Sequence, residues 1–86
     1  MNISKAEQRT LHVLARGGCI AVEKDDKGRI IKVNCVTPEG WSLADCTLAL
    51  FKKLKKRRFI ASYDSRPYTI TYDGRKAVRG QLDNRG

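Results

Sequence analysis

The first pattern of apolar positions, which recur at helical spacing between polar ones, predicts a helix over residues 5–16. Ser4 stands in the N-cap position and Glu7 follows three residues later, the spacing of a capping box, in which each side chain accepts a backbone N–H from the other residue. The leucines of this segment recur at helical spacing and form one apolar stripe. The glycine pair at 17–18 supplies the stop.

Two runs rich in β-branched residues follow, at 19–24 and 29–35, and the sequence DDKG separates them. A short loop that ends in glycine between two such runs predicts a β-hairpin. Strand alternation gives this hairpin an apolar face, formed by Ile20, Val22, Ile31, Val33 and Cys35, and a polar face, formed by Glu23, Lys32 and Asn34.

A second helix is predicted after the Pro-Gly turn at 36–40, with its start between Ser42 and Asp45, either of which can cap it. On a helical wheel the apolar residues of this segment occupy about one half. Three lysines at 52, 53 and 56 occupy the other half. The helix is therefore expected to be amphipathic, with a basic outer face.

The last third of the chain predicts a second hairpin and a third helix. Residues 59–63 and 67–72 resemble strands around a turn at 64–66, because Tyr68, Ile70 and Tyr72 alternate with threonines. Either Thr71 or Asp73 can cap a helix that runs to about Leu82 and buries Ala77, Val78 and Leu82. Residues 83–86 are expected to form a frayed tail.

The order helix–hairpin–helix–hairpin–helix predicts a single α+β domain over residues 1–86 with a winged-helix-like arrangement. In that arrangement the second hairpin is the wing, and the helix before it is the one that other winged helices insert into DNA. One feature departs from the pattern, because a hairpin stands where a winged helix has its second helix.

Charge is concentrated in one segment. The chain carries a net charge of +9, and six of its 18 basic residues lie in FKKLKKRRFI at 51–60, which contains no acid. Such a patch creates a local field that attracts polyanions. The residues predicted to bind a partner or nucleic acid are Lys52, Lys53, Lys55, Lys56, Arg57 and Arg58, with Arg66 and Tyr68 on the wing.

Three interpretations of this patch remain open. It is the solvated face of a helix whose last cations complement the helix dipole, a site that binds phosphates, or a docking face for an acidic protein. The exposed positions are almost all lysine, whereas base readers are typically Asn, Gln or Arg, so binding to nucleic acid would be non-specific.

Catalytic and metal sites are not indicated. The single histidine, His12, has no nucleophile at a meaningful spacing, and Cys19, Cys35 and Cys46 contain no Cys-x2–4-Cys pair. We therefore expect no enzymatic activity, no cofactor and no bound metal. Trp41 is expected to cover the core, with a role as an anchor for a protein partner as the alternative.

The N-terminal residues lack the apolar run of a signal peptide, and no segment reaches the ~18 consecutive apolar residues of a membrane span. An odd number of cysteines does not suit a disulfide framework. These features predict a cytoplasmic protein with reduced thiols and no contact with a membrane.

Four segments resemble the YjhX family of small bacterial proteins: EQRTLHVLARGG at 7–18, DCTLALFKKLKK at 45–56, PYTITYDGR at 67–75 and QLDNR at 81–85. The resemblance implies the toxin of a toxin–antitoxin pair, which inhibits DNA topoisomerase I by binding that enzyme and is neutralised by an acetyltransferase-like antitoxin. It assigns no functional residues. The alternative is a small basic winged-helix protein that binds DNA and regulates transcription.

Overall fold

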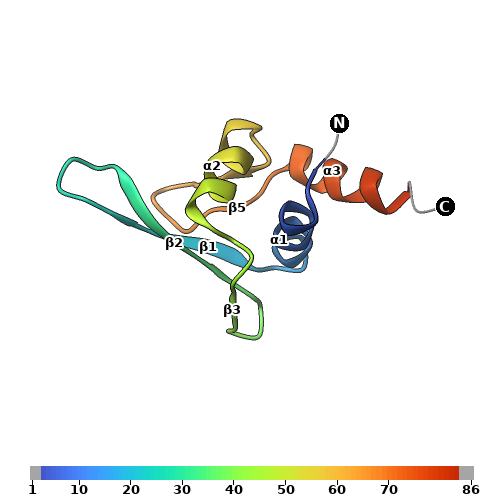
Figure 1. Ribbon diagram of the computed structural model, residues 1–86, viewed down its shortest axis with the longest axis horizontal. Coiled ribbons are helices and arrows are strands. Elements are labelled where there is room, and N and C mark those ends of the chain that lie inside the picture. Colours follow the sequence, from blue (N-terminus) through green and yellow to red (C-terminus); the bar gives the residue numbers. More distant parts are fainter. Residues whose placement is uncertain (1–2, 84–86) are drawn as a thin grey trace.

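Residues 3–83, which the computed structural model describes, form three helices and two small antiparallel sheets (Figure 1). Side chains are described for residues 3–79. The predicted α+β class is confirmed. Residues 84–86, most of the predicted frayed tail, lie outside the described part of the chain, and so does the side chain of Leu82.

Helix α1 (Lys5–Ala15) begins with the predicted capping box. The hydroxyl of Ser4 accepts the N–H of Glu7 at 3.1 Å, and the carboxylate of Glu7 accepts the N–H of Ser4 at 3.0 Å. Arg16 is the C-cap of the helix. Leu11 and Leu14 of the predicted apolar stripe are buried in the core.

Strands β1 (Cys19–Lys24) and β2 (Ile30–Val36) form the first hairpin, which we call the arm because it projects from the body of the molecule (Figure 1). Ile20 pairs with Cys35, and Val22 pairs with Val33, as the apolar face requires. The prediction for Ile31 is wrong, since 55% of this residue is exposed. The register shifts between Glu23 and Lys24, where Lys24 pairs with Ile30, so Ile30 packs against the core in place of Ile31.

A third strand, β3 (Ser42–Leu43), was not predicted. Ser42 pairs with Val36, and Leu43 pairs with Cys35, which extends the sheet in the order β1-β2-β3. The predicted start of the second helix between Ser42 and Asp45 is therefore wrong, because pairing with β2 holds Ser42 and Leu43 in an extended conformation.

Helix α2 (Leu48–Lys56) begins later than predicted. Thr47 is its N-cap, and the Thr47 hydroxyl accepts the N–H of Leu50 at 3.2 Å. Asp45, which was a candidate cap, instead accepts a hydrogen bond from Arg9 of α1 at 2.9 Å.

Strands β4 (Ile60–Ala61) and β5 (Thr69–Ile70) make a second, shorter hairpin. Just before β5, Tyr68 exchanges two backbone hydrogen bonds with Ile20 of β1, each 2.8 Å long. This bridge joins the second hairpin to the open edge of the first sheet.

Helix α3 (Tyr72–Asp83) follows, and the Thr71 hydroxyl accepts the N–H of Gly74 in its first turn at 3.1 Å. Tyr72 was predicted to end the strand at 67–72, on the same face as Tyr68 and Ile70. That prediction is wrong, because Tyr72 opens α3 and is 75% exposed. A side chain at Gly74 would collide with the carbonyl oxygen of Phe59, so only glycine fits where α3 crosses the end of the α2–β4 link.

The core lies between α1, α2, α3 and the inner face of the arm's base. Its fully buried side chains come from α1, the arm and α2 and include Leu11, Leu14, Ile20, Cys35, Phe51 and Leu54. Val78 of α3 is buried as predicted, and Ala77 is half-buried.

Candidate binding surface

Helix α2 divides into a buried and a basic side, as its periodicity predicts. Leu50, Phe51 and Leu54 are buried against the core. The lysines of the last two turns are all exposed and include Lys52, Lys53, Lys55 and Lys56. With Arg57 and Arg58, which are exposed at the end of the helix, they form what we call the α2 basic face.

The end of α2 holds Arg58 in a left-handed backbone conformation, with φ at 62°. The N–H of Arg58 donates to the carbonyl of Lys55 at 3.0 Å, and the N–H of Phe59 donates to the carbonyl of Leu54 at 3.0 Å. This is the hydrogen-bond pattern of a Schellman motif, in which glycine is the usual residue at this position. An arginine there costs about 1 kcal/mol of backbone strain. The cost is consistent with a role for the Arg58 side chain.

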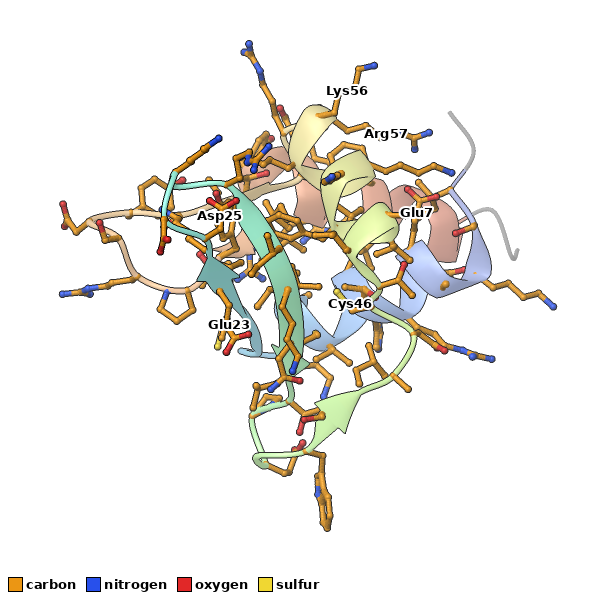
Figure 2. The ribbon with its side chains drawn as sticks, turned by 60° about the vertical axis from the view of Figure 1, so that its left-hand side comes forward. Glu7, Glu23, Asp25, Cys46, Lys56 and Arg57 are labelled. Atoms are coloured by element: carbon orange, nitrogen blue, oxygen red, sulfur yellow. The ribbon has the colours of Figure 1, made fainter. Side chains whose placement is uncertain are left out.

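Arg57 forms an ion pair with a buried carboxylate of α1. A guanidinium nitrogen of Arg57 lies 3.7 Å from Glu7 Oε2, and the side chains are 35% and 5% exposed respectively. Figure 2 shows Glu7 below Arg57 at the end of α2. The other oxygen of Glu7 completes the capping box, so one carboxylate links the start of α1 to the end of α2. Sequence reasoning found the capping box but not this second partner.

The two wing residues of the predicted site lie in different environments. Arg66 is exposed in the turn between β4 and β5. Tyr68 is half-buried, with its ring edge-on to Phe51 at 4.9 Å between centroids, and Lys55 Nζ lies 5.8 Å from the centre of the Tyr68 ring. The structure therefore brings Tyr68 together with α2 rather than placing it at the tip of a wing.

A groove of about 380 Å³ runs between the arm and α2. It contains two cations of α2, Lys52 and Lys55, and two of the arm, Lys24 and Arg29. The arm's contribution was missed because the sequence predicts a hairpin without indicating which helix lies beside it. The loop region from 24 to 29 gave little signal of its own, because its three basic residues are accompanied by two aspartates.

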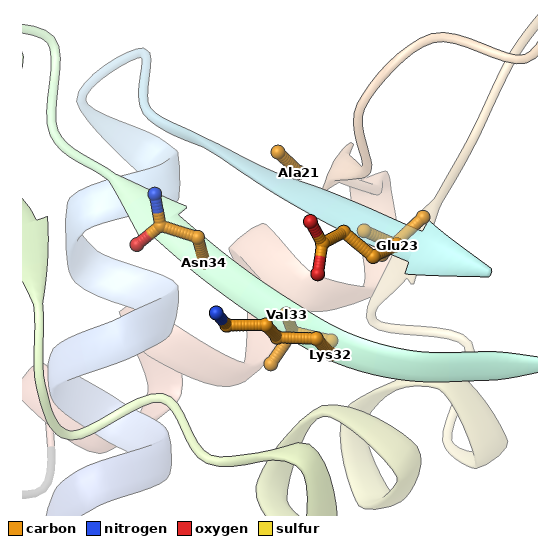
Figure 3. Close-up of a pocket in the computed structure, with 6 residues that line it drawn as sticks. Ala21, Glu23, Lys32, Val33 and Asn34 are labelled. Carbon is orange, nitrogen blue, oxygen red and sulfur yellow. The ribbon is translucent and has the colours of Figure 1, made fainter. Parts of the chain in front are cut away.

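The opposite, polar face of the arm forms a shallow hollow of about 430 Å³ (Figure 3). Glu23 and Lys32 are register partners there, and Asn34 projects from the same face. The face carries one acid and one base side by side, so it has no net charge with which to attract a polyanion.

Trp41 lies on the surface, and the expectation that it covers the core is wrong. The residue is 71% exposed. Its backbone is held in a tight turn, in which Trp41 N–H donates to the Thr37 hydroxyl at 3.0 Å and Thr37 N–H donates to the Trp41 carbonyl at 2.7 Å. The ion pair between Arg16 and Glu39 ties the same turn to the end of α1. An exposed Trp on a turn whose backbone is hydrogen-bonded in this way is the type of residue that anchors protein interfaces.

The cysteines are free thiols, with Cys35 and Cys46 buried and Cys19 half-buried. The neighbouring Cys46 thiol and burial both raise the pKa of Cys35, which therefore stays protonated at neutral pH.

His12 is exposed on α1. Within the described residues no group of three or more His, Cys, Asp or Glu side chains is placed to hold a metal ion. In the same part of the chain, every helix is too short or too polar to cross a membrane.

Comparison with known proteins gives one family. The model of the YjhX toxin family, described as "Putative toxin of bacterial toxin-antitoxin pair", matches residues 1–85. A UPF0386 protein of Parvibaculum lavamentivorans is 69% identical over 85 residues, which cover 99% of this chain and 100% of that protein. UPF0386 proteins of Caulobacter vibrioides and Brucella anthropi are 59% and 51% identical, over 99% of this chain and over 93% and 100% of their own lengths. No solved structure matches the chain.

Proposed function

Because the chain belongs to the YjhX toxin family, we propose that it is the toxin of a toxin–antitoxin pair and that it acts by binding through the α2 basic face. One observation carries the proposal: six of the seven residues from 52 to 58 are cations exposed to solvent, and no acid lies among them. A merely solvated helix face usually mixes both signs, because oppositely charged pairs at i and i+4 stabilise it.

The family resemblance points to DNA topoisomerase I as the target. A surface that holds DNA is itself positively charged, so the α2 basic face would dock on an acidic region beside that surface and block the path of the DNA from there. Electrostatic attraction would accelerate the encounter, and an exposed aromatic anchor such as Trp41 would slow release. The antitoxin would neutralise the toxin by covering the same face with acidic groups.

Binding without catalysis agrees with the chemistry of the surface. Lysine ammonium groups at the α2 basic face lie in water, and none of the described cysteines or the single histidine is paired as a nucleophile with a base.

The decisive experiment measures growth arrest in cells and enzyme inhibition in vitro for the same variants. The triple variant Lys52→Glu/Lys53→Glu/Lys56→Glu should lose both growth arrest on induced expression and inhibition of supercoiled-DNA relaxation by purified topoisomerase I. A matched triple variant, Lys5→Glu/Lys32→Glu/Lys76→Glu, removes the same charge from α1, the arm and α3, and it should keep both activities. Equal loss in the two variants would show that net charge, and not the α2 basic face, is responsible.

Added DNA separates the two modes of inhibition. Inhibition that persists when duplex DNA is in excess supports direct binding to the enzyme. Inhibition that disappears as DNA is added would instead support coating of the substrate, and the protein would then be a DNA-binding protein. In that case six neutralised phosphates predict a slope of about −5 for log affinity against log salt.

The alternative, a DNA-binding regulator with a winged-helix arrangement, uses α2 as the recognition helix and β4–β5 as the wing. The order of α2, β4, β5 and α3 favours it. Against it, the segment between α1 and α2 is a three-stranded sheet with loops rather than a helix that could support α2 in a DNA groove.

A further inference from the structure

The groove between the arm and α2 has a composition that the α2 basic face lacks, because it combines cations with apolar surface. Its cations come from two elements, and its remaining lining is Gly28, Ile30, Phe51 and Tyr68. No acidic side chain lines it. Charges on opposing walls of a groove reinforce one another's field more than charges spread over a convex helix.

The arm presents its two cations on a fixed turn. The Asp25 carboxylate accepts the N–H groups of Lys27 and Arg29, both at 2.9 Å, and also bonds to Arg29 Nε at 3.0 Å. Lys24 pairs with Ile30 beyond an irregularity in register after Glu23, and both residues line the groove. The Arg29–Asp25 ion pair leaves 73% of the Arg29 side chain exposed, and exposed pairs of this kind are worth about 1 kcal/mol or less, so Arg29 can exchange its partner for a ligand.

Aromatic and aliphatic side chains form the rest of the wall. Tyr68 and Ile30 are half-buried, and the Tyr68 ring is fixed edge-on against Phe51. The ammonium of Lys55 lies beside the same ring, so a cation and an aromatic surface are adjacent at one point of the groove.

We propose that this groove binds single-stranded nucleic acid, with its four cations on phosphates and with Tyr68 and Ile30 against a base or sugar. Single-strand sites in proteins combine basic grooves with aromatic surfaces in this way. The bases of a duplex are paired and stacked inside it, so its phosphates could contact the cations of the groove but its bases could not contact the apolar wall. Lys53 and Lys56 continue the positive charge along α2 outside the groove, which suits a strand that runs on rather than a single nucleotide.

This inference goes beyond the proposed function, because Lys24 and Arg29 are not part of the α2 basic face. It stands or falls independently of the toxin's protein target. If both hold, the protein contacts an enzyme through α2 and a displaced strand through the groove.

The test is fluorescence anisotropy with a labelled oligothymidine of about ten nucleotides, a length within common single-strand sites. A duplex of the same length and adenosine monophosphate serve as competitors. Titrations between about 50 and 200 mM salt should give a slope near −3 for four phosphate contacts at ~0.7 each. Lys24→Ala/Arg29→Ala should bring the slope to about −1.4 and weaken binding by roughly tenfold at 0.1 M salt.

The matched control is Lys32→Ala/Lys76→Ala, which removes two exposed cations that lie outside the groove lining. It should change the slope little. Arg29→Ala retains the backbone bond from Arg29 N–H to Asp25, so the turn is expected to persist, and thermal unfolding followed by circular dichroism checks this. If the alanine variant unfolds, Lys24→Gln/Arg29→Gln replaces it.

Four results would overturn the proposal. The first is duplex binding as tight as single-strand binding, and the second is an equal loss of affinity in the control variant. The third is displacement of the strand by adenosine monophosphate at equal nucleotide concentration, which would make the groove a mononucleotide site. Absence of any binding to the strand would also refute it. The Lys24→Ala/Arg29→Ala variant keeps Lys52, Lys53 and Lys56, so its inhibition of topoisomerase tests the α2 basic face separately from the groove.

Discussion

The ion pair between Glu7 and Arg57 should stabilise the fold measurably, although most ion pairs on protein surfaces do not. The perturbation is a double-mutant cycle of Glu7→Gln and Arg57→Ala. Gln keeps an oxygen to accept the Ser4 N–H of the capping box, so the cycle removes the charge and not the cap. Any other effect of removing the Arg57 side chain cancels in the coupling energy.

The magnitude follows from the geometry. Two unit charges 3.7 Å apart attract one another by about 4 kcal/mol at an effective dielectric constant near 20. Desolvation of the Glu7 carboxylate, which is only 5% exposed, offsets much of that energy, and solvent screens Arg57, which is 35% exposed. We expect a coupling energy of about 1–2 kcal/mol. Arg57→Ala alone should cost about 2–3 kcal/mol, because it leaves a buried carboxylate without its cation.

Urea denaturation of the wild type, the two single variants and the double variant measures the coupling. In a domain of this size 1 kcal/mol also corresponds to roughly 4–8 °C in Tm. The matched control is the pair Arg16–Glu39, which is shorter, at 3.1 Å, but has side chains that are 55% and 52% exposed. Its coupling should be below about 0.5 kcal/mol. A Glu7–Arg57 coupling within about 0.5 kcal/mol of zero, or no larger than the control, would refute the reasoning that burial decides the strength of the pair.

Three further predictions test single features of the structure. Arg58→Gly should leave stability unchanged or raise it by up to about 1 kcal/mol in urea denaturation, because glycine adopts a φ of 62° without strain, and a loss of more than about 1 kcal/mol would show that the Arg58 side chain has a structural role. Trp41, the single tryptophan, should fluoresce in the native protein with a solvent-exposed spectrum and be quenched by iodide almost as strongly as after unfolding, whereas a blue-shifted, protected emission would contradict its exposure. The backbone N–H of Arg29 is the largest cause that lowers the pKa of the Asp25 carboxyl below its ordinary 3.8. The stabilisation of the turn by this carboxylate is therefore fully present above pH 3.8 and lost as pH falls through the lower pKa of the folded state. The Arg29 amide resonance in NMR should move only in that acidic range, and a midpoint above pH 3.8 would contradict the assignment.

The structure changes the meaning of the basic segment at the end of α2. The sequence presents six cations as one group, but the fold gives them different surroundings. Lys52 and Lys55 line the groove with the arm, Lys53 and Lys56 face away from it into solvent, and Arg57 contacts Glu7. A binding measurement that removes all six at once would therefore mix the effects of two surfaces and one structural ion pair.

The features that the sequence predicted well depend on residues within about four positions of one another. The capping box of α1, the arm as a hairpin, the amphipathic character of α2 and Thr71 as one of the two candidate caps of α3 are all present. Each arises from a local hydrogen bond or from the repeat of a helix or strand, which a short window of sequence contains in full.

The features that were missed depend on which distant segments meet. Ser42 and Leu43 have the local signals of a helix start, but pairing with Val36 and Cys35 makes them a strand and delays α2 to Leu48. Trp41 is exposed because that same strand places its turn at the edge of the sheet, away from the core.

The sequence by itself thus determined the α+β class, the order of the helices and the two hairpins, and the concentration of positive charge on one helix. Only the tertiary structure decided that Glu7 would hold Arg57 and that Lys24 and Arg29 would face Lys52 and Lys55 across a groove. The physical reason is that helix caps and strand alternation are short-range, whereas a pairing between residues tens of positions apart is set by the packing of the whole core.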